Sequence, residues 1–264
     1  MKYSRVSRMT LTAALAIVGL AAGRAVAAPV YLQDYEAPGN LDAPFNLVPD
    51  FSGTTVGIVA ATDAITHVAT SGAVAGSGSA QLFFEHNTAE SPTAAGWQWQ
   101  VRFIPNSGAS NTGAGTGINP LFAADGYVGY YLKVDPAVTA NIQTAPVLEG
   151  SGGTGEATSG VLQTVIKDGQ WHRYQWNMDD PAQFPGTFTT VYAGGLGNTS
   201  LEATNSFDSI ALVSSNGGNA TINIDQIGYD NAGQLPQAIP EPSSLALVLG
   251  SAVGSLGFIR RRAA

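Results

Sequence analysis

Three segments of the chain, 97–103, 127–134 and 171–178, alternate apolar and polar residues. If the apolar positions face a protein core, the opposite faces carry amides, cations and tyrosines. These polar positions are Gln98, Gln100, Arg102, Tyr127, Tyr131, Lys133, Arg173, Gln175 and Asn177. Amides and guanidinium groups donate forked hydrogen bonds to hydroxyl groups, and tyrosine rings stack on sugar rings.

If the three segments are neighbours in one sheet, their polar faces form one ligand surface for extracellular polysaccharide. The alternative is an ordinary polar exterior. The ligand-binding candidates are Gln98, Gln100, Arg102, Tyr131, Lys133, Arg173 and Gln175. Tryptophans 97, 99 and 176 lie on the apolar faces, so we expect them in the core.

Catalytic chemistry has little support in the sequence. The three histidines lie in unrelated segments, the chain has no cysteine, and neither a Gly-x-Ser-x-Gly elbow nor a His-Glu-x-x-His metal motif occurs. We therefore predict no catalytic residue. The competing interpretation is a glycoside hydrolase or lyase, in which two of four acids form a catalytic pair. These acids are Glu85, Glu90, Glu149 and Glu156.

The elements expected to position these residues are strands. Period-two alternation also occurs in 30–36, 79–86, 159–166, 206–213 and 220–229, with Gly- and Asn-rich turns between them. The segment 28–230 contains no amphipathic helical pattern. We predict an all-β fold, an antiparallel jelly-roll β-sandwich, formed by one domain over 28–230.

Three short phrases resemble known sandwich families. Asp168–Tyr174 reads DGQWHRY, as in carbohydrate-binding jelly rolls and laminin-G-like domains, and 222–227 resembles the last strand of galactose-binding-like domains. The phrase 34–36 resembles their first strand. In those families the first and last strands share a structural calcium ion. The resemblance implies that Glu36 and Asp225 donate carboxylate oxygens, the ligands that Ca²⁺ prefers.

The charge of the domain excludes one class of partner. After both ends are set aside, the domain keeps four basic against eighteen acidic residues, a net charge of −14. Such a surface repels nucleic acid, and we expect no nucleic-acid partner.

The two ends predict export. Residues 1–27 have a basic start, an apolar stretch and the Ala-Val-Ala cleavage pattern of a signal peptide, which implies the Sec export machinery and signal peptidase as partners. At the other end, 231–239 is a predicted linker. It is followed by Pro240, Glu241 and Pro242, an uncharged span over 243–259, and Arg260, Arg261 and Arg262.

This C-terminal order resembles the PEP-CTERM sorting signal of Gram-negative bacteria, here over 240–264. The resemblance implies an exosortase as partner, transient anchoring in the inner membrane by one transmembrane helix, and final placement at the cell surface or outside it. The alternative is an ordinary tail anchor. The sequence therefore predicts an exported, non-catalytic protein that is structural or polysaccharide-associated.

Overall fold

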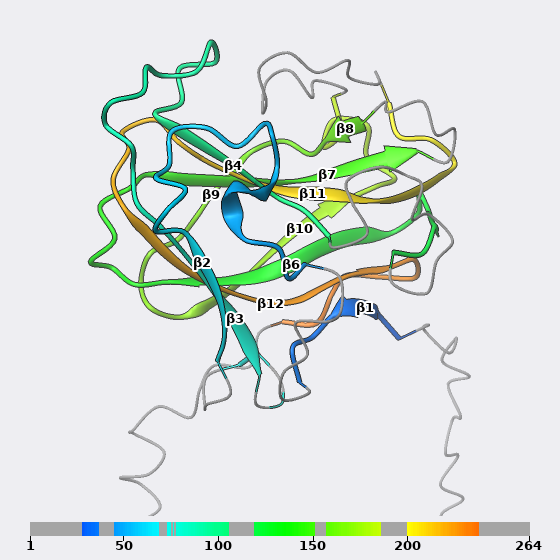
Figure 1. Ribbon diagram of the computed structural model, residues 1–264. Coiled ribbons are helices and arrows are strands. Elements are labelled where there is room, and N and C mark those ends of the chain that lie inside the picture. Colours follow the sequence, from blue (N-terminus) through cyan, green and yellow to red (C-terminus); the bar gives the residue numbers. More distant parts are fainter. Residues whose placement is uncertain are drawn as a thin grey trace, which may run out of the picture.

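The computed structural model describes residues 28–36, 45–68, 73–74, 76, 78–105, 119–150, 157–185 and 200–237. The predicted signal peptide and sorting signal lie outside these residues. Two antiparallel sheets pack face to face, which confirms the predicted all-β sandwich (Figure 1). The helical structure in the described ranges is one 3-10 turn, η1 (Pro49–Phe51), and no described helix has the length and apolarity to span a bilayer.

The first sheet, called sheet A here, has the strand order β10-β6-β12-β3-β2, with β1 also paired to β12. Its strands are β1 (Val30–Gln33), β2 (Ala64–Val68), β3 (Ser79–Phe84), β6 (Tyr127–Val134), β10 (Trp171–Asn177) and β12 (Ala220–Asp230). Strand β12 is central and has a bulge between Asp225 and Gly228. The strand predicted over 127–134 is confirmed at both ends.

The second sheet, sheet B, has the order β4-β11-β7-β8, with β5 paired to β11 and β9 paired to β7. Its strands are β4 (Trp99–Phe103), β5 (Phe122–Ala123), β7 (Ile142–Gly150), β8 (Ala157–Ser159), β9 (Gln163–Thr164) and β11 (Thr204–Ser214). The segment around Val56 extends this sheet beyond β4 through a bridge to Gln100.

The core lies between the sheets and is rich in aromatic side chains. Trp99 and Trp176 are fully buried there, and Trp99 meets Phe84 edge-on with ring centroids 4.8 Å apart. Trp97 is only half-buried, so the expectation of a core position is wrong for this tryptophan. Trp97 lies before β4, so the alternation of core-facing and outward-facing residues in that strand does not extend to it.

Strand β7 is a central strand that the sequence pattern did not reveal. It contains Pro146, which normally argues against a central strand because proline cannot donate to the ladder. Here the strand pairs with β8 at 147–149 and with β9 at 143–144, so Pro146 lies at the gap between these partners. The carbonyl oxygen of Pro146 accepts a hydrogen bond from the backbone N–H of Gly160, on the side of β7 that faces β8 and β9. No strand residue lies opposite Pro146 on this side, so the missing N–H of proline costs no ladder bond.

The strand predicted over 159–166 is wrong in its continuity. The structure has two short strands, β8 and β9, separated at Gly160. A Cβ atom at Gly160 would lie 2.7 Å from the Trp176 ring and 2.9 Å from the Pro146 ring, so the chain turns where only glycine fits.

Candidate functional site

The three strands that carry the predicted ligand residues belong to different sheets. Strands β6 and β10 are neighbours in sheet A, whereas β4 lies in sheet B. The premise of one surface across all three strands is therefore wrong. Alternation determines which residues share a face of one strand, but not which strands adjoin. Tyr131, Lys133, Arg173 and Gln175 remain together on sheet A, and Gln98, Gln100 and Arg102 are separated from them.

On sheet A, the outer face of β6 and β10 holds a segment of the same chain. We call residues 234–236 the C-terminal strap. Arg173, which lies opposite Tyr131 in the register, donates to the carbonyl oxygen of Leu235 and, over 3.2 Å, to Oε1 of Gln234. Tyr131 donates its hydroxyl to the carbonyl oxygen of Pro236, and the Leu235 side chain is fully buried. The predicted ligand side chains thus bind part of the predicted linker.

The strap is held by a small number of contacts. Burying one leucine contributes about 1.5–3 kcal/mol, two hydrogen bonds from a guanidinium group about 3–6 kcal/mol, and one from a tyrosine about 1 kcal/mol. Ordering the three strap residues and Gln237 costs about 4–8 kcal/mol. These terms nearly cancel, so the strap is the kind of segment that opens locally without global unfolding.

On sheet B, Arg102 is bound to a buried acid. Its guanidinium group forms a two-pronged ion pair with Asp208, through Nη2 and, over 3.1 Å, through Nε. Burial raises the pKa of Asp208, and the adjacent Arg102 partly offsets that rise. Asp208 is 2% exposed and Ser209 also donates to it. The two charges compensate each other, so the Arg102 guanidinium group stabilises the buried Asp208 carboxylate.

Asp208 was not predicted as a partner of Arg102. A signal for it exists in the sequence, because Asp208 and Ser209 interrupt an otherwise apolar segment. In the structure the register of β11 against β7 shifts between Phe207 and Ser209, which is the bulge that turns this acid toward Arg102.

Gln100 lines a hollow at the β4 edge of sheet B. The Gln100 hollow has a volume of about 390 Å³ and is lined by Gly53, Thr54, Val56, Glu90, Ser91, Thr93 and Gln100. The Gln100 side chain is 3% exposed and donates from Nε2 to the carbonyl oxygen of Thr54 at 2.7 Å. Its Oε1 atom is buried and accepts no hydrogen bond. A buried amide oxygen without a donor is costly, so this atom is a candidate ligand acceptor.

Gln98 and the remaining sheet A candidates have structural surroundings of their own. Gln98 is half-buried just before β4, and its backbone N–H donates to Ser214. Lys133 and Gln175 are half-buried on sheet A, and the Oε1 atom of Gln175 is buried without a hydrogen-bond donor.

Of the two predicted calcium ligands, Asp225 lies at the bulge in the middle of β12 and Glu36 follows β1 nearby. Asp225 is fully buried and accepts hydrogen bonds from the backbone N–H groups of Val74 and Gln226, at 2.9 and 2.7 Å. Burial, together with the nearby acids Glu36 and Asp34, raises the pKa of Asp225 to about 8, although the two hydrogen bonds lower it. The two predicted ligands are therefore close enough to interact electrostatically.

The backbone is unusual beside both acids. Tyr35 has φ 54° and Gln226 has φ 46°, conformations that residues other than glycine rarely adopt. In the described part of the chain, no three His, Asp or Glu side chains converge closely enough to hold a metal ion by themselves. Main-chain oxygens or water would have to complete any calcium site here.

Of the four acids of the hydrolase interpretation, Glu90 and Glu149 lie too far apart to form a catalytic pair. Glu90 accepts hydrogen bonds from Gly57 N and Asn87 Nδ2, at 2.7 and 2.8 Å, and lies by the Gln100 end of sheet B. Glu149 lies opposite Ser206, seven residues along β11 from the residue opposite Gln100. That is roughly 23 Å of strand, whereas catalytic pairs are about 5–10 Å apart. Glu85 is half-buried after β3, and Glu156 lies outside the described residues.

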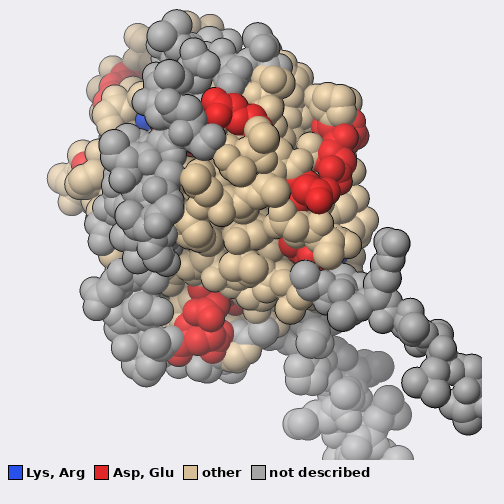
Figure 2. All heavy atoms as spheres, turned by 90° about the vertical axis from the view of Figure 1, so that its right-hand side faces the viewer, with Lys and Arg blue, Asp and Glu red and all other residues tan. Residues whose placement is uncertain are grey.

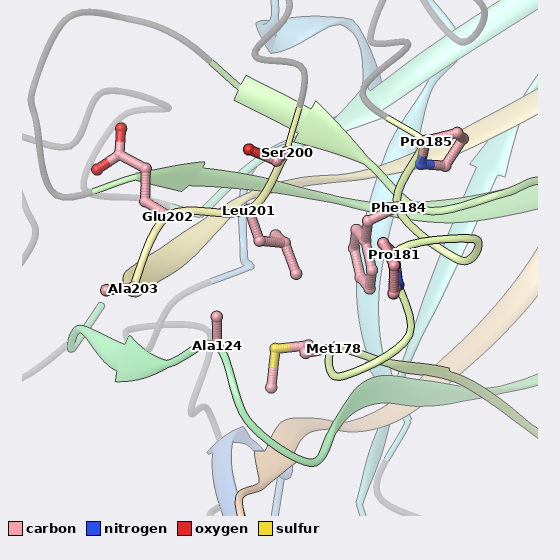
Figure 3. A pocket seen from close by; sticks show the side chains of 9 residues that line it. All are labelled: Ala124, Met178, Pro181, Phe184, Pro185, Ser200, Leu201, Glu202 and Ala203. Atoms are coloured by element: carbon pink, nitrogen blue, oxygen red, sulfur yellow. The ribbon is translucent and has the colours of Figure 1, made fainter.

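A second hollow, of about 540 Å³, has a different character. Figure 3 shows Ala124, Met178, Phe184 and Leu201 around its centre, with the Glu202 carboxylate pointing away. The polar side chains of its lining are Ser200 and Glu202, whereas Thr54, Glu90, Ser91, Thr93 and Gln100 line the Gln100 hollow. The Gln100 hollow therefore fits a hydroxyl-rich ligand better.

The surface charge agrees with the composition. On the face seen in Figure 2, acidic side chains form several separate groups and basic side chains are scarce. This view gives no sign of the basic stripe that nucleic-acid binding requires.

Comparisons with known proteins give distant structural similarities. The chain matches no protein-family model, and no curated protein aligns with it significantly. A family 11 carbohydrate-binding module of a cellulosomal cellulase from Clostridium thermocellum is similar with a TM-score of 0.43 and 13% identity, over 80% of this chain and 98% of that one.

Two further structures are more distant. A family 11 module from Clostridium thermocellum in complex with a mixed-linked tetrasaccharide gives a TM-score of 0.39 and 12% identity, over 66% and 86% of the two chains. A structure from a study of the promiscuous specificity of carbohydrate-binding modules of the β-sandwich superfamily gives a TM-score of 0.36 and 8% identity. The match covers 67% of this chain and 58% of that one.

Proposed function

We propose that this chain is an exported, non-catalytic surface protein whose sandwich binds neutral polysaccharide in the Gln100 hollow. The observation that supports the proposal best is that Gln100, a residue lining that hollow, has a buried Oε1 atom without a hydrogen-bond donor. A sugar hydroxyl is a donor of suitable size. The volume of about 390 Å³ lies within the range of small-molecule sites.

The other lining residues favour a neutral ligand. Thr54, Ser91 and Thr93 contribute hydroxyl groups, and Glu90 contributes a carboxylate. A carboxylate in a domain with a net charge of −14 repels anionic sugars. Hydroxyl groups, in contrast, both donate to and accept from neutral sugar hydroxyls.

Apolar contacts are available beside these polar groups. Val56 lines the hollow and is 36% exposed. Phe51, which belongs to the turn η1 beside β4, is 59% exposed, the most exposed large hydrophobic side chain among the described residues. An exposed aromatic ring two residues before the hollow can stack on the apolar face of a sugar ring.

Two sequence patterns support the proposed location of the protein. The signal-peptide pattern of 1–27 supports export by the Sec machinery and cleavage by signal peptidase. The tail pattern of 240–264 supports sorting by an exosortase, through transient anchoring in the inner membrane by 243–259, toward the cell surface or extracellular space.

A structural calcium ion at Glu36 and Asp225 belongs to the same proposal. Asp225 and Glu36 offer the carboxylate oxygens that Ca²⁺ prefers, and main-chain oxygens or water would complete the site. When bound, calcium would fix β1 to the bulge of β12. The test is thermal unfolding with added Ca²⁺ or chelator, and we expect a higher Tm with Ca²⁺ that is lost in Asp225→Asn.

Affinity electrophoresis of the full chain tests the polysaccharide proposal. The panel is neutral β-glucan, xylan and galactomannan, with anionic alginate for comparison. We expect retardation by at least one neutral polysaccharide and loss of that retardation in Gln100→Leu. The matched control is Gln81→Leu, a half-buried glutamine on β3 of the other sheet. Equal retardation of wild type and Gln100→Leu, or none by any neutral glycan, would contradict the proposal.

A further inference from the structure

We propose that the outer face of β6 and β10 is a second binding surface for a neutral, extended polysaccharide, and that the C-terminal strap is its displaceable cover. The inference rests on the proposed function for its ligand class, but on different residues. The Gln100 hollow lies at the edge of sheet B, and this face lies on sheet A.

The strap occupies the face much as an extended ligand would. Arg173 and Tyr131 are opposite each other on adjacent strands, and both donate to main-chain carbonyl oxygens of consecutive strap residues. A third contact, from Gln234 Nε2 to the Tyr127 hydroxyl, is 3.5 Å long. The face therefore recognises an extended chain that carries neutral oxygen acceptors. A neutral polysaccharide presents the same acceptors.

The strap leaves one group of this face unsatisfied. Gln175 follows Arg173 by two residues, so its side chain points from the same face of β10. Its Oε1 atom is buried and has no donor. The carbonyl oxygens of the strap cannot donate to it, whereas sugar hydroxyls both accept and donate. A polysaccharide thus satisfies the donors of Arg173 and Tyr131 and this acceptor together.

The attachment of the strap allows it to leave. It follows β12 through the bends at 231–233, which include Gly233. Within the described residues, no main-chain to main-chain hydrogen bond joins 234–237 to the sheet. Departure of the strap therefore leaves the ladder between β6 and β10 intact.

The test opens the strap in the full chain. Leu235→Asp places a charge at a fully buried position, and Leu121→Asp places the same charge at a leucine that is 37% exposed. Retardation by neutral β-glucan, xylan and galactomannan is measured for both variants, for wild type and for Leu235→Asp/Arg173→Ala. Leu235→Gly is the second opening variant, and circular dichroism verifies the fold of each protein.

We expect Leu235→Asp and Leu235→Gly to bind a neutral polysaccharide about tenfold more tightly than wild type, because an open face no longer competes with its cover. The gain disappears in the double variant and is absent in Leu121→Asp. Folded opening variants with no gain overturn the inference, even if wild type is retarded through Gln100. Conversely, a gain that depends on Arg173 supports it even if the Gln100 hollow fails its own test.

Discussion

The outer faces of the two sheets each contain a buried aspartate, and the two differ in their partners. Asp208 on sheet B is paired with Arg102 through two hydrogen bonds, and Ser209 donates a third. Asp225 on sheet A receives two backbone N–H groups and has Glu36 and Asp34 as its nearby charges. The first carboxylate is compensated by an adjacent guanidinium group, whereas the second has other acids beside it, and we propose that a bound cation compensates them.

The same contrast separates the two arginines that were predicted as ligand residues. Arg102 compensates a charge that the fold has buried, so its role is structural. Arg173 donates to carbonyl oxygens of an exposed strap, and those acceptors can turn to water if the strap opens. We therefore expect Arg173, whose partners are neutral, to become available to a ligand more readily than Arg102.

The largest expected effect concerns Asp225 and pH. Its folded pKa of about 8 lies above the ordinary carboxyl value, so the folded state holds a proton that the unfolded state has lost. The contribution of Asp225 to the free energy of unfolding is therefore fully present below about pH 4. It is lost as the pH rises to 8, by on the order of 5 kcal/mol without divalent cations. Urea unfolding with chelator at several pH values measures this, and Asp225→Asn should flatten the profile. A stability that rises over this range in wild type would contradict it.

The next effect is the loss of the ion pair on sheet B. Arg102→Ala leaves Asp208 buried without its cation, and we expect a destabilisation of about 3–5 kcal/mol. The double variant Arg102→Ala/Asp208→Leu should recover most of that loss, because it removes the uncompensated acid. Urea unfolding of the single and double variants measures both. Additive losses would show that the pair does not act as a unit.

The matching substitution on sheet A is expected to be milder. Arg173→Ala removes two bonds of the strap, but the strap has only a small net stability, so its opening limits the expected loss to about 1–2 kcal/mol. ¹⁵N relaxation of Gln234, Leu235 and Gln237 should show greater mobility, and hydrogen exchange should show unchanged protection in β6. If Arg173→Ala destabilises as strongly as Arg102→Ala, the proposed difference between the two faces is wrong.

Gln100 should have the smallest effect on stability. Gln100→Leu loses one bond to Thr54 but also removes an amide oxygen that has no donor, so these terms oppose each other. We expect a change below about 1 kcal/mol in either direction. A much larger loss in urea unfolding would mean that Gln100 serves the fold rather than a ligand.

The sequence predicted the sandwich but not the neighbours of each strand. The alternation of apolar and polar residues correctly predicted where β6 begins and ends. It also placed Arg102, Tyr131 and Arg173 on the faces that point away from the core. It could not show that β4 and β6 belong to different sheets, because strand order depends on long-range pairing. Strand β7 was not predicted because it contains Pro146. A central strand tolerates this proline only because it lies between the segments paired with β8 and β9.

The site could be predicted only in part for the same reason. Gln100 was a candidate from its position in a strand, but the hollow around it is completed by residues from two distant loops, 53–56 and 90–93. The strap gave no signal, because Gln234 to Pro236 has the composition of a linker. Its place on the sheet depends on two donors that lie far earlier in the chain.

The most direct test of the central claim is an NMR titration of the ¹⁵N-labelled full chain with an oligosaccharide of a neutral polysaccharide from the panel. The account predicts shifts of the Gln100 side-chain amide and of backbone signals in 53–56 and 90–93, which surround the hollow. Signals of β7, on the far side of β11 from β4, should remain unchanged. Shifts that leave Gln100 and both loops unchanged, or no shifts with β-glucan, xylan or galactomannan oligosaccharides, would contradict it.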